Sequence, residues 1–244
     1  MSDDAIPAAT VILVREREGG APELLMVVRA VDMAFAGGAW VFPGGRIDEA
    51  DRRIDASDGG ARVAAVREAL EETAIPIGLS PLPSPDLSAA LQAQLLDGSE
   101  LDQLLAPHGI DLDLETLVPL ARWVPKFHAK RRFDTLFFVA RAPDGEWIPN
   151  TMESECTGAH WVTAADALER DASGEIQLIF PTRRTLERLA QHGSFDAIVA
   201  DAQSYPIDPI TPWLDEVDGE RFVTIPDGIG YPVTREKIDG LCRG

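Results

Sequence analysis

Runs of apolar residues divide the first part of the chain into strands. Residues 10–14 form one such run, and residues 23–29 form a second, continuous run that is typical of a strand buried on both faces. A charged stretch with a Gly-Gly pair, residues 16–22, joins the two runs and predicts a hairpin. Residues 40–42 predict a short strand that leads into a Pro-Gly-Gly turn.

Helical spacing replaces strand alternation after residue 60. Val63, Val66 and Leu70 recur at intervals of three and four residues, which predicts a helix with this stripe buried. At about 100° per residue, three carboxylates fall together in one arc beside the stripe. They belong to Glu68, Glu71 and Glu72.

The rest of the chain mixes both patterns. Several prolines follow residue 75, after which residues 86–96 and 99–105 predict two short helices, each opened by Asp or Ser as N-cap. We interpret residues 80–116 as a helical insertion. Further strands are predicted at 117–124, 133–140 and 158–162, a helix capped by Thr163 with Asp166 at its N3 position, helices at 182–192 and 195–202, and one strand of a terminal hairpin at 221–225.

This order of elements predicts an α/β fold. Strands before a helix, an inserted helical piece, more strands and closing helices are typical of an α/β/α sandwich around a mixed sheet. The length of 244 residues suits one large domain with additions. We assign residues 1–200 to that domain and residues 201–244 to a C-terminal extension packed on it.

Charge narrows the range of partners. The net charge of −19 repels nucleic-acid backbone and anionic membranes, so neither is expected as a partner. The two cysteines, Cys156 and Cys242, lack metal-ligand spacing and indicate a reducing compartment. The sequence shows no signal-peptide pattern and no apolar run long enough for a bilayer, which makes the cytoplasm the expected location.

The three clustered glutamates can be read in two ways. Most charged helix faces are simply solvated, but those faces usually mix opposite charges at i,i+4. Here Glu68 and Glu72 are like charges at that spacing, and Arg67 can pair with Glu71, but no Lys follows the cluster to neutralise it. A hard cation such as Mg²⁺ prefers carboxylate oxygens and shares its shell with substrate phosphates. The glycines in front also allow close approach of backbone to a ligand or metal.

This stretch resembles the Nudix box, G-x5-E-x7-R-E-U-x-E-E-x-G-U, where U is a bulky apolar residue. Gly45 takes the place of the first Gly, Arg67 begins the R-E-U-x-E-E core, and Ile75 takes the last U. Asp51 stands in place of the first Glu, and fifteen residues rather than seven separate it from Arg67. Ala74 stands where the family has Gly. Because Ala in a left-handed helix cap costs about 1–2 kcal/mol, we expect this helix to end differently.

The resemblance implies a Nudix fold and a Mg²⁺- or Mn²⁺-dependent diphosphatase. It implies that Glu68, Glu72 and Glu71, with the backbone of Gly45, hold the metal. Glu71 serves as a ligand or as the general base, and Arg67 orients the cluster. Gly44 lies against the substrate. An acidic residue before the strand at 158–162 often supplies a further ligand or base in the family, and Glu155 is the candidate.

One basic cluster, residues 126–132, stands out in this acidic chain. It can be a solvated loop whose ion pairs contribute little. Alternatively, Arg131 and Arg132 clamp phosphate, for which the guanidinium group is well suited. The isolation of the cluster favours the phosphate clamp.

A second resemblance concerns the substrate. Coenzyme A-cleaving Nudix enzymes carry a pattern like L-L-T-x-R-[SA]-x3-R-x3-G-x3-F-P-G-G. Leu24-Leu25, Arg29 and Gly38 match it, whereas Ala34 replaces the second Arg. The string from Arg131 to Phe138 and the long insertion resemble the peroxisomal coenzyme A diphosphatase branch. Arg29 is therefore expected to bind substrate, and coenzyme A or an acyl-coenzyme A is the first choice.

Two alternatives remain. Within the same chemistry, the substrate is ADP-ribose, NADH or a nucleoside diphosphate sugar. In a different class, the chain is a non-catalytic module that binds a nucleotide, although such modules usually lose the acidic core that this chain keeps. The expected partner is a small nucleotide substrate, and a homodimer is a common Nudix arrangement.

Overall fold

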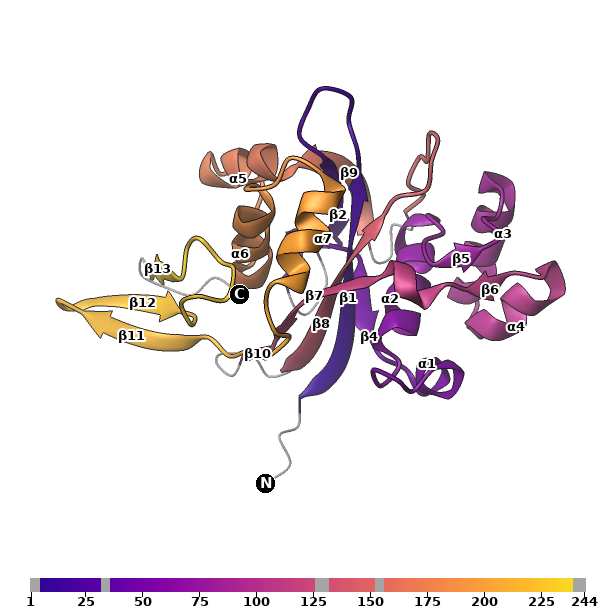
Figure 1. Cartoon of the computed structure of the whole chain (residues 1–244), viewed down its shortest axis with the longest axis horizontal. Coiled ribbons are helices and arrows are strands. Elements are labelled where there is room, and N and C mark those ends of the chain that lie inside the picture. Colours follow the sequence, from indigo (N-terminus) through magenta and orange to yellow (C-terminus); the bar gives the residue numbers. More distant parts are fainter. Residues whose placement is uncertain (1–4, 32–35, 126–131, 152–155, 239–244) are drawn as a thin grey trace.

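A mixed eight-stranded sheet runs through the centre of the molecule, with helices on both faces (Figure 1). The computed structural model describes residues 5–31, 36–125, 132–151 and 156–238. β1 (Ile6–Arg15) lies in the middle, parallel to β8 (Phe133–Arg141). On its other side, β1 pairs antiparallel with β2 (Glu23–Arg29) near its end and with β4 (Gly44–Arg46) near its start.

The outer strands extend this sheet on both sides. β9 (Cys156–Thr163) and β3 (Trp40–Val41) pair antiparallel with β2. β7 (Val118–Trp123) pairs antiparallel with β8, and β10 (Pro209–Ile210) joins the edge of β7 in parallel. The predicted mixed sheet and the predicted hairpin between the first two strands are confirmed.

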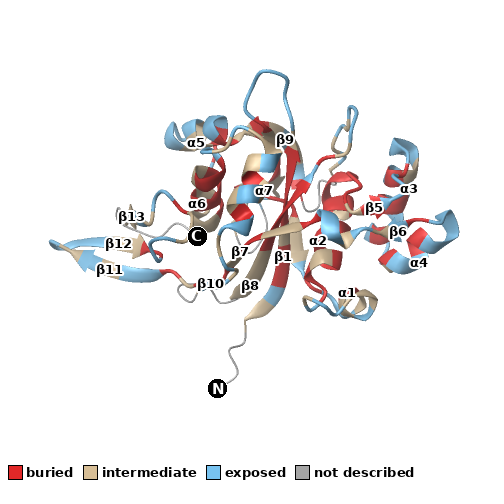
Figure 2. Cartoon of the chain, viewed as in Figure 1, coloured by how far each residue is buried: buried red, intermediate tan, exposed pale blue. Residues whose placement is uncertain are grey.

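Alternation along β1 divides the interior into two cores. Val11 and Leu13 pack on the face that carries α2, whereas Ile12 and Val14 pack on the opposite face. All four are fully buried because successive residues of a strand point to opposite faces, both of which are covered by helices (Figure 2).

The first face is covered by the candidate helix and the insertion. These elements are α1 (Glu49–Ile54), α2 (Ala61–Thr73), α3 (Pro85–Leu96), α4 (Leu101–Leu105), the 3₁₀ turns η1 (Ala106–His108) and η2 (Leu114–Thr116), and the ribbon β5 (Leu79–Ser80) with β6 (Asp111–Leu112). The predicted helical insertion is confirmed. Its caps differ from the prediction, since Ser84 caps α3 and Glu100 precedes α4. Leu91, Leu95 and Leu101 belong to the same core as Val66 of α2.

The second face is covered by α5 (Ala164–Ala172), α6 (Phe180–Leu189) and α7 (Phe195–Gln203). The Thr163 side chain accepts a hydrogen bond from the Asp166 N–H at 3.1 Å, as the capping pattern predicts. α6 begins two residues before the predicted start at Thr182, because Pro181 is well placed in a first helical turn.

The C-terminal extension contributes to this second core. β10 joins the main sheet, and Trp123 Nε1 donates to Tyr231 Oη at 3.2 Å. Ile225 and Tyr231 are buried in the core. The predicted strand at residues 221–225 corresponds to β12 (Glu220–Thr224), which forms a hairpin with β11 (Trp213–Val217). A third strand, β13 (Arg235–Lys237), pairs with β12, and the three-stranded sheet projects from the body (Figure 1).

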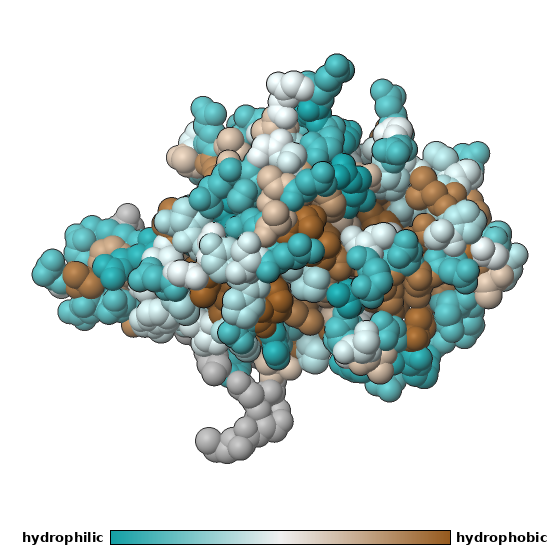
Figure 3. Space-filling model, viewed as in Figure 1, coloured by the Kyte–Doolittle hydropathy of each residue, from teal (hydrophilic) through white to brown (hydrophobic). Residues whose placement is uncertain are grey.

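An open groove of about 300 Å³ lies between α7 and α2, where apolar surface gathers (Figure 3). Leu117, Val118, Tyr205 and Ile207 line it, and Arg62 is its only lining residue on α2. Within the described ranges, none of the helices is both long and apolar enough to cross a membrane.

Candidate active site

Two glycines of β4 contact glutamate side chains of α2. The Gly44 N–H donates a hydrogen bond to Glu72 Oε2 at 3.1 Å. A Cβ atom at Gly45 would lie 2.3 Å from Glu68 Oε1, which is closer than any real contact of this kind. The Glu68 carboxylate therefore rests directly against the Gly45 backbone, and a side chain at position 45 would displace it.

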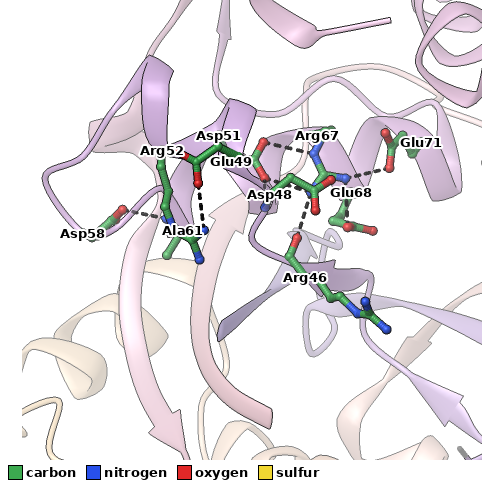
Figure 4. A network of polar contacts seen from close by, with 10 residues as sticks. All are labelled: Arg46, Asp48, Glu49, Asp51, Arg52, Asp58, Ala61, Arg67, Glu68 and Glu71. Atoms are coloured by element: carbon green, nitrogen blue, oxygen red, sulfur yellow. Dashed lines mark hydrogen bonds and ion pairs between the residues drawn. The ribbon is translucent and has the colours of Figure 1, made fainter. Parts of the chain in front are cut away.

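Arg67 connects the parts of this site (Figure 4). Its Nε and Nη2 donate to the two oxygens of Asp51 at 3.0 and 2.9 Å. Its Nη1 donates to Glu68 Oε1 and to Glu71 Oε2, both at 2.9 Å, and Nη2 also donates to the Arg46 carbonyl at 2.8 Å. One guanidinium thus holds α1, β4 and two of the three glutamates in a single arrangement.

The charge of Arg67 is secure although the side chain is buried. Burial by itself lowers the pKa of the guanidinium, but the hydrogen bonds to Asp51 and the charges of Glu68 and Glu71 outweigh burial and raise that pKa. Arg67 therefore stays cationic at every pH at which the protein is folded. It offsets the repulsion between carboxylates that the sequence pattern implied.

Asp51, which stands where the Nudix box has its first Glu, is buried beside Arg67. It is 1% exposed, and its Oδ2 also accepts the Asp48 N–H at 2.8 Å at the start of α1. The residues added after Asp51 form the rest of α1 and a tight turn to α2. Gly60 allows this turn: its φ is 87°, and a Cβ there would lie 2.8 Å from the Arg52 nitrogen. The residues added between Asp51 and α2 therefore leave the Asp51 side chain in contact with Arg67.

The expectation that α2 ends differently from the Nudix pattern because of Ala74 is wrong. Ala74 adopts the left-handed conformation, with φ 58° and ψ 14°, and its N–H donates to the Leu70 carbonyl at 2.9 Å. Neighbouring Thr73 and Ile75 are fully buried. Burial on both sides holds Ala74 in a conformation that glycine would adopt with less strain.

The donor set suits a hard cation. Glu68 and Glu72 bring carboxylate oxygens to the Gly-Gly strand, Glu71 brings one to Arg67, and Mg²⁺ and Mn²⁺ prefer such oxygens. In the described part of the chain, no three Asp, Glu, His or Cys side chains are already gathered around one point as the ligands of an ion would be. The residue types fit a divalent metal, while Arg67 holds the carboxylates of Glu68 and Glu71 and the Gly44 N–H holds that of Glu72.

The backbone geometry bears on the prediction for Gly45. The Val11 N–H donates to the Pro43 carbonyl and the Ile47 N–H donates to the Pro7 carbonyl, so alternate residues of β4 face β1. By this alternation the Gly45 carbonyl faces β1, whereas the Gly44 N–H faces Glu72. A backbone oxygen for the metal fits Gly44 better than Gly45.

The other predicted site residues are not brought into this cluster by the described contacts. Glu155 and Arg131 lie outside the described residues. Arg29 is half-buried at the end of β2, opposite Cys156 of β9. Arg132 precedes β8, and its carbonyl accepts the Ile6 N–H at 2.8 Å. Their roles in substrate binding stay predictions.

Two residues near the site were missed by sequence reasoning, Gln92 and Asn150. Gln92 is 1% exposed and donates to the Glu71 carbonyl at 2.8 Å. A signal was available, because Gln92 follows Leu91 on the apolar side of a predicted helix. A polar side chain at such a position needs hydrogen-bond partners.

The mixed sheet lies between helices, and the glutamates of α2 contact the Gly-Gly pair of β4. This arrangement is that of a Nudix domain. Residues 5–92 match the model of the NUDIX domain. A protein of Caenorhabditis elegans provisionally named nudix hydrolase 7 is 25% identical over 208 residues, which cover 82% of this chain. The match covers 66% of that relative, so the chain spans just under two thirds of its length.

A solved structure agrees over the same share of the chain. The crystal structure of a NUDIX hydrolase from Alicyclobacillus acidocaldarius is 28% identical and superposes with a TM-score of 0.71. The superposition covers 82% of this chain and 97% of that one. The chain therefore has the Nudix fold, and residues 5–92 are similar in sequence to the NUDIX domain.

Proposed function

We propose that this protein is a Mg²⁺- or Mn²⁺-dependent hydrolase of a diphosphate bond linked to a nucleoside. The observation that carries the proposal is the cluster of three glutamates that Arg67 and the Gly44–Gly45 backbone hold in one place. A bound divalent ion would supply positive charge for the diphosphate and a more acidic water. The chemistry needs such charge, because the chain as a whole repels anions.

The residues of the box then have separate roles. Glu68 and Glu72 hold the metal, one against Gly45 and the other oriented by the Gly44 N–H. Glu71 is a ligand or the general base. Arg67, which Asp51 anchors, is a positioning residue that keeps Glu68 and Glu71 side by side.

Glutamine substitution tests the metal ligands. Glu68→Gln and Glu72→Gln remove one negative charge each with little change in shape, and turnover should fall by roughly a hundredfold or more. Initial rates with saturating Mg²⁺ and the melting temperature of each variant are the measurements. Glu169→Gln on exposed α5 makes the same chemical change away from the site and should leave rates unchanged. Full activity in Glu72→Gln with metal present would refute the assignment.

For the substrate, coenzyme A or an acyl-coenzyme A is our first choice, cut to 3′,5′-ADP and a phosphopantetheine. The support is the upstream sequence pattern with Arg29 and Gly38, together with the arginines before β8, which would suit a 3′-phosphate. Ala34, where the pattern has Arg, weighs against it. ADP-ribose, NADH or a nucleoside diphosphate sugar is the second candidate.

A substrate panel separates these candidates. Coenzyme A, acetyl-coenzyme A, dephospho-coenzyme A, ADP-ribose and NADH would be incubated with Mg²⁺ and the products identified by mass. The expected result is that the coenzyme A species turn over fastest. Arg131→Ala and Arg132→Ala should slow coenzyme A more than dephospho-coenzyme A, because a guanidinium clamp acts on the 3′-phosphate. Faster cleavage of ADP-ribose or NADH would reject the first choice.

The same materials test the non-catalytic alternative. If the chain is a binding module, calorimetry will find tight nucleotide binding while no product accumulates over long incubation. The intact glutamate cluster favours hydrolysis instead.

A further inference from the structure

The last turn of α2 is completed by two residues from distant parts of the chain. Gln92 Nε2, from α3, donates to the Glu71 carbonyl at 2.8 Å. The Asn150 N–H, from the segment after β8, donates to the Thr73 carbonyl at 2.9 Å. These two bonds occupy carbonyl groups that a helix end leaves without intrahelical partners.

Gln92 and Asn150 also bind each other. Gln92 Nε2 donates to the Asn150 carbonyl at 2.7 Å, and Asn150 Nδ2 donates to Gln92 Oε1 at 2.7 Å. Each polar atom of the Gln92 side chain therefore has a partner, although the residue is 1% exposed. We call the two residues the Gln92–Asn150 clasp. It connects the insertion, α2 and the segment before β9.

The clasp lies at the carboxyl end of α2, where negative charge accumulates. The carboxyl end of a helix carries partial negative charge, which disfavours carboxylates in the last turns. Glu71 and Glu72 lie in the last turn of α2, which contains no basic residue. Arg67 donates to the Glu71 carboxylate, and the Gly44 N–H donates to that of Glu72. Gln92 Nε2 and the Asn150 N–H donate to carbonyls of this turn, and these donors offset part of the negative charge at the helix end.

We propose that Gln92 and Asn150 are positioning residues for the metal-binding glutamates, and that the insertion is thereby part of the catalytic apparatus. This inference rests on the proposed function. By fixing the Glu71 and Thr73 carbonyls, the clasp sets the rotation of the last turn. That rotation places the Glu72 carboxylate at the Gly44 N–H of β4 and the Glu71 carboxylate at Arg67. Partners at this remove from a metal typically change metal affinity or activity by 10- to 100-fold.

A purely structural role would produce a different pattern of effects. If the clasp only packs α3 on α2, its loss lowers stability but leaves the folded fraction with normal metal affinity and turnover. If it positions the glutamates, the folded protein binds metal more weakly. Metal affinity in the absence of substrate therefore distinguishes the two roles.

The experiment compares Gln92→Met with Gln94→Met in the full-length chain. Methionine keeps the length of the side chain and removes both amide donors. Gln94 is exposed on the same helix and donates only to the Ala90 carbonyl in the adjacent turn, so its variant is a matched control. Mn²⁺ affinity by calorimetry, the Mg²⁺ concentration for half-maximal rate, kcat and KM are measured well below the melting temperature of each variant.

For Gln92→Met we expect Mn²⁺ affinity to fall about tenfold, the Mg²⁺ requirement to rise by a similar factor, and kcat to fall with little change in KM. Gln94→Met should match the wild type. If Gln92→Met does not fold, Asn150→Ala takes its place. This variant removes one amide and keeps both backbone bonds, so a smaller shift in the same direction is expected.

Failure of this inference can be told from failure of the proposed function. Wild-type Mn²⁺ affinity and Mg²⁺ dependence in a folded clasp variant would overturn the inference while hydrolysis stands. If the wild type hydrolyses nothing in the panel, Mn²⁺ affinity still decides the clasp, because that measurement needs no substrate. Weakened affinity then supports the inference, and unchanged affinity overturns it.

Discussion

At the scale of single residues, Asp51 and Ala74 depart from the Nudix box that this stretch resembles. Asp51 is shorter than glutamate, yet both its oxygens reach Arg67. The turn at Gly60, just before α2, packs against the backbone of Asp51 and Arg52 in α1. The sequence identified the position of Asp51, but its distance to Arg67 depends on how the inserted residues fold.

Ala74 provides the test at this scale. Ala in the left-handed conformation is strained by about 1–2 kcal/mol, whereas glycine adopts it freely. Ala74→Gly should therefore raise the free energy of unfolding by about 1 kcal/mol, after the greater freedom of glycine in the unfolded chain is counted. Urea denaturation is the measurement.

The control for Ala74→Gly is the same substitution at Ala89, an exposed position in the middle of α3. There it should lower stability by about 1 kcal/mol, because glycine disfavours helix. A loss of stability in both variants would mean that the conformation of Ala74 carries no strain.

At the scale of elements, the insertion proved to be part of the core. The pattern of residues 86–105 was sufficient to predict two helices, but it did not predict where in the fold they pack. In the structure, Leu91, Leu95 and Leu101 share one core with α2. Deleting residues 80–116 would expose this core to solvent, so the deletion would report on folding and not on the site. Single substitutions at the clasp avoid that problem.

The projecting sheet shows the reverse case, in which the pattern was too weak. β13 is the tripeptide Arg235-Glu236-Lys237, which has no apolar alternation. It pairs with β12 through the backbone, and Glu236 forms ion pairs with Arg183 and Arg184 of α6. Partners so far away in the sequence leave no local signal, which is why only one strand of a hairpin was predicted.

At the scale of the whole molecule, buried Arg188 joins the C-terminal extension to the domain. It is 1% exposed, its Nε donates to Asp201 Oδ2 at 2.6 Å, and its Nη1 donates to the Leu120 carbonyl at 3.2 Å. A Cβ at Gly230 would lie 2.9 Å from its guanidinium, so the extension packs directly on it. The division at residue 200 stays a prediction, but the two parts share this core.

Arg188→Met should destabilise the protein by about 3 kcal/mol, because it leaves Asp201 without its partner in a largely buried position. Equilibrium unfolding in urea measures the effect. Arg221→Met, at an exposed position on the projecting sheet, should stay within about 0.5 kcal/mol of the wild type. A similarly small change in Arg188→Met would show that Arg188 contributes little to holding the extension on the domain.

The sequence by itself determined the local elements and the chemical identity of the site. Helical spacing after residue 60 and the arrangement of Glu68, Glu71 and Glu72 on one arc follow from neighbours within a few residues, where periodicity is a reliable guide. The tertiary structure decided what holds those glutamates in place. Asp51, Gly45, Gln92 and Asn150 reach α2 from other segments. Such contacts depend on how helices and strands pack in three dimensions, and hydrophobic periodicity carries no information about them.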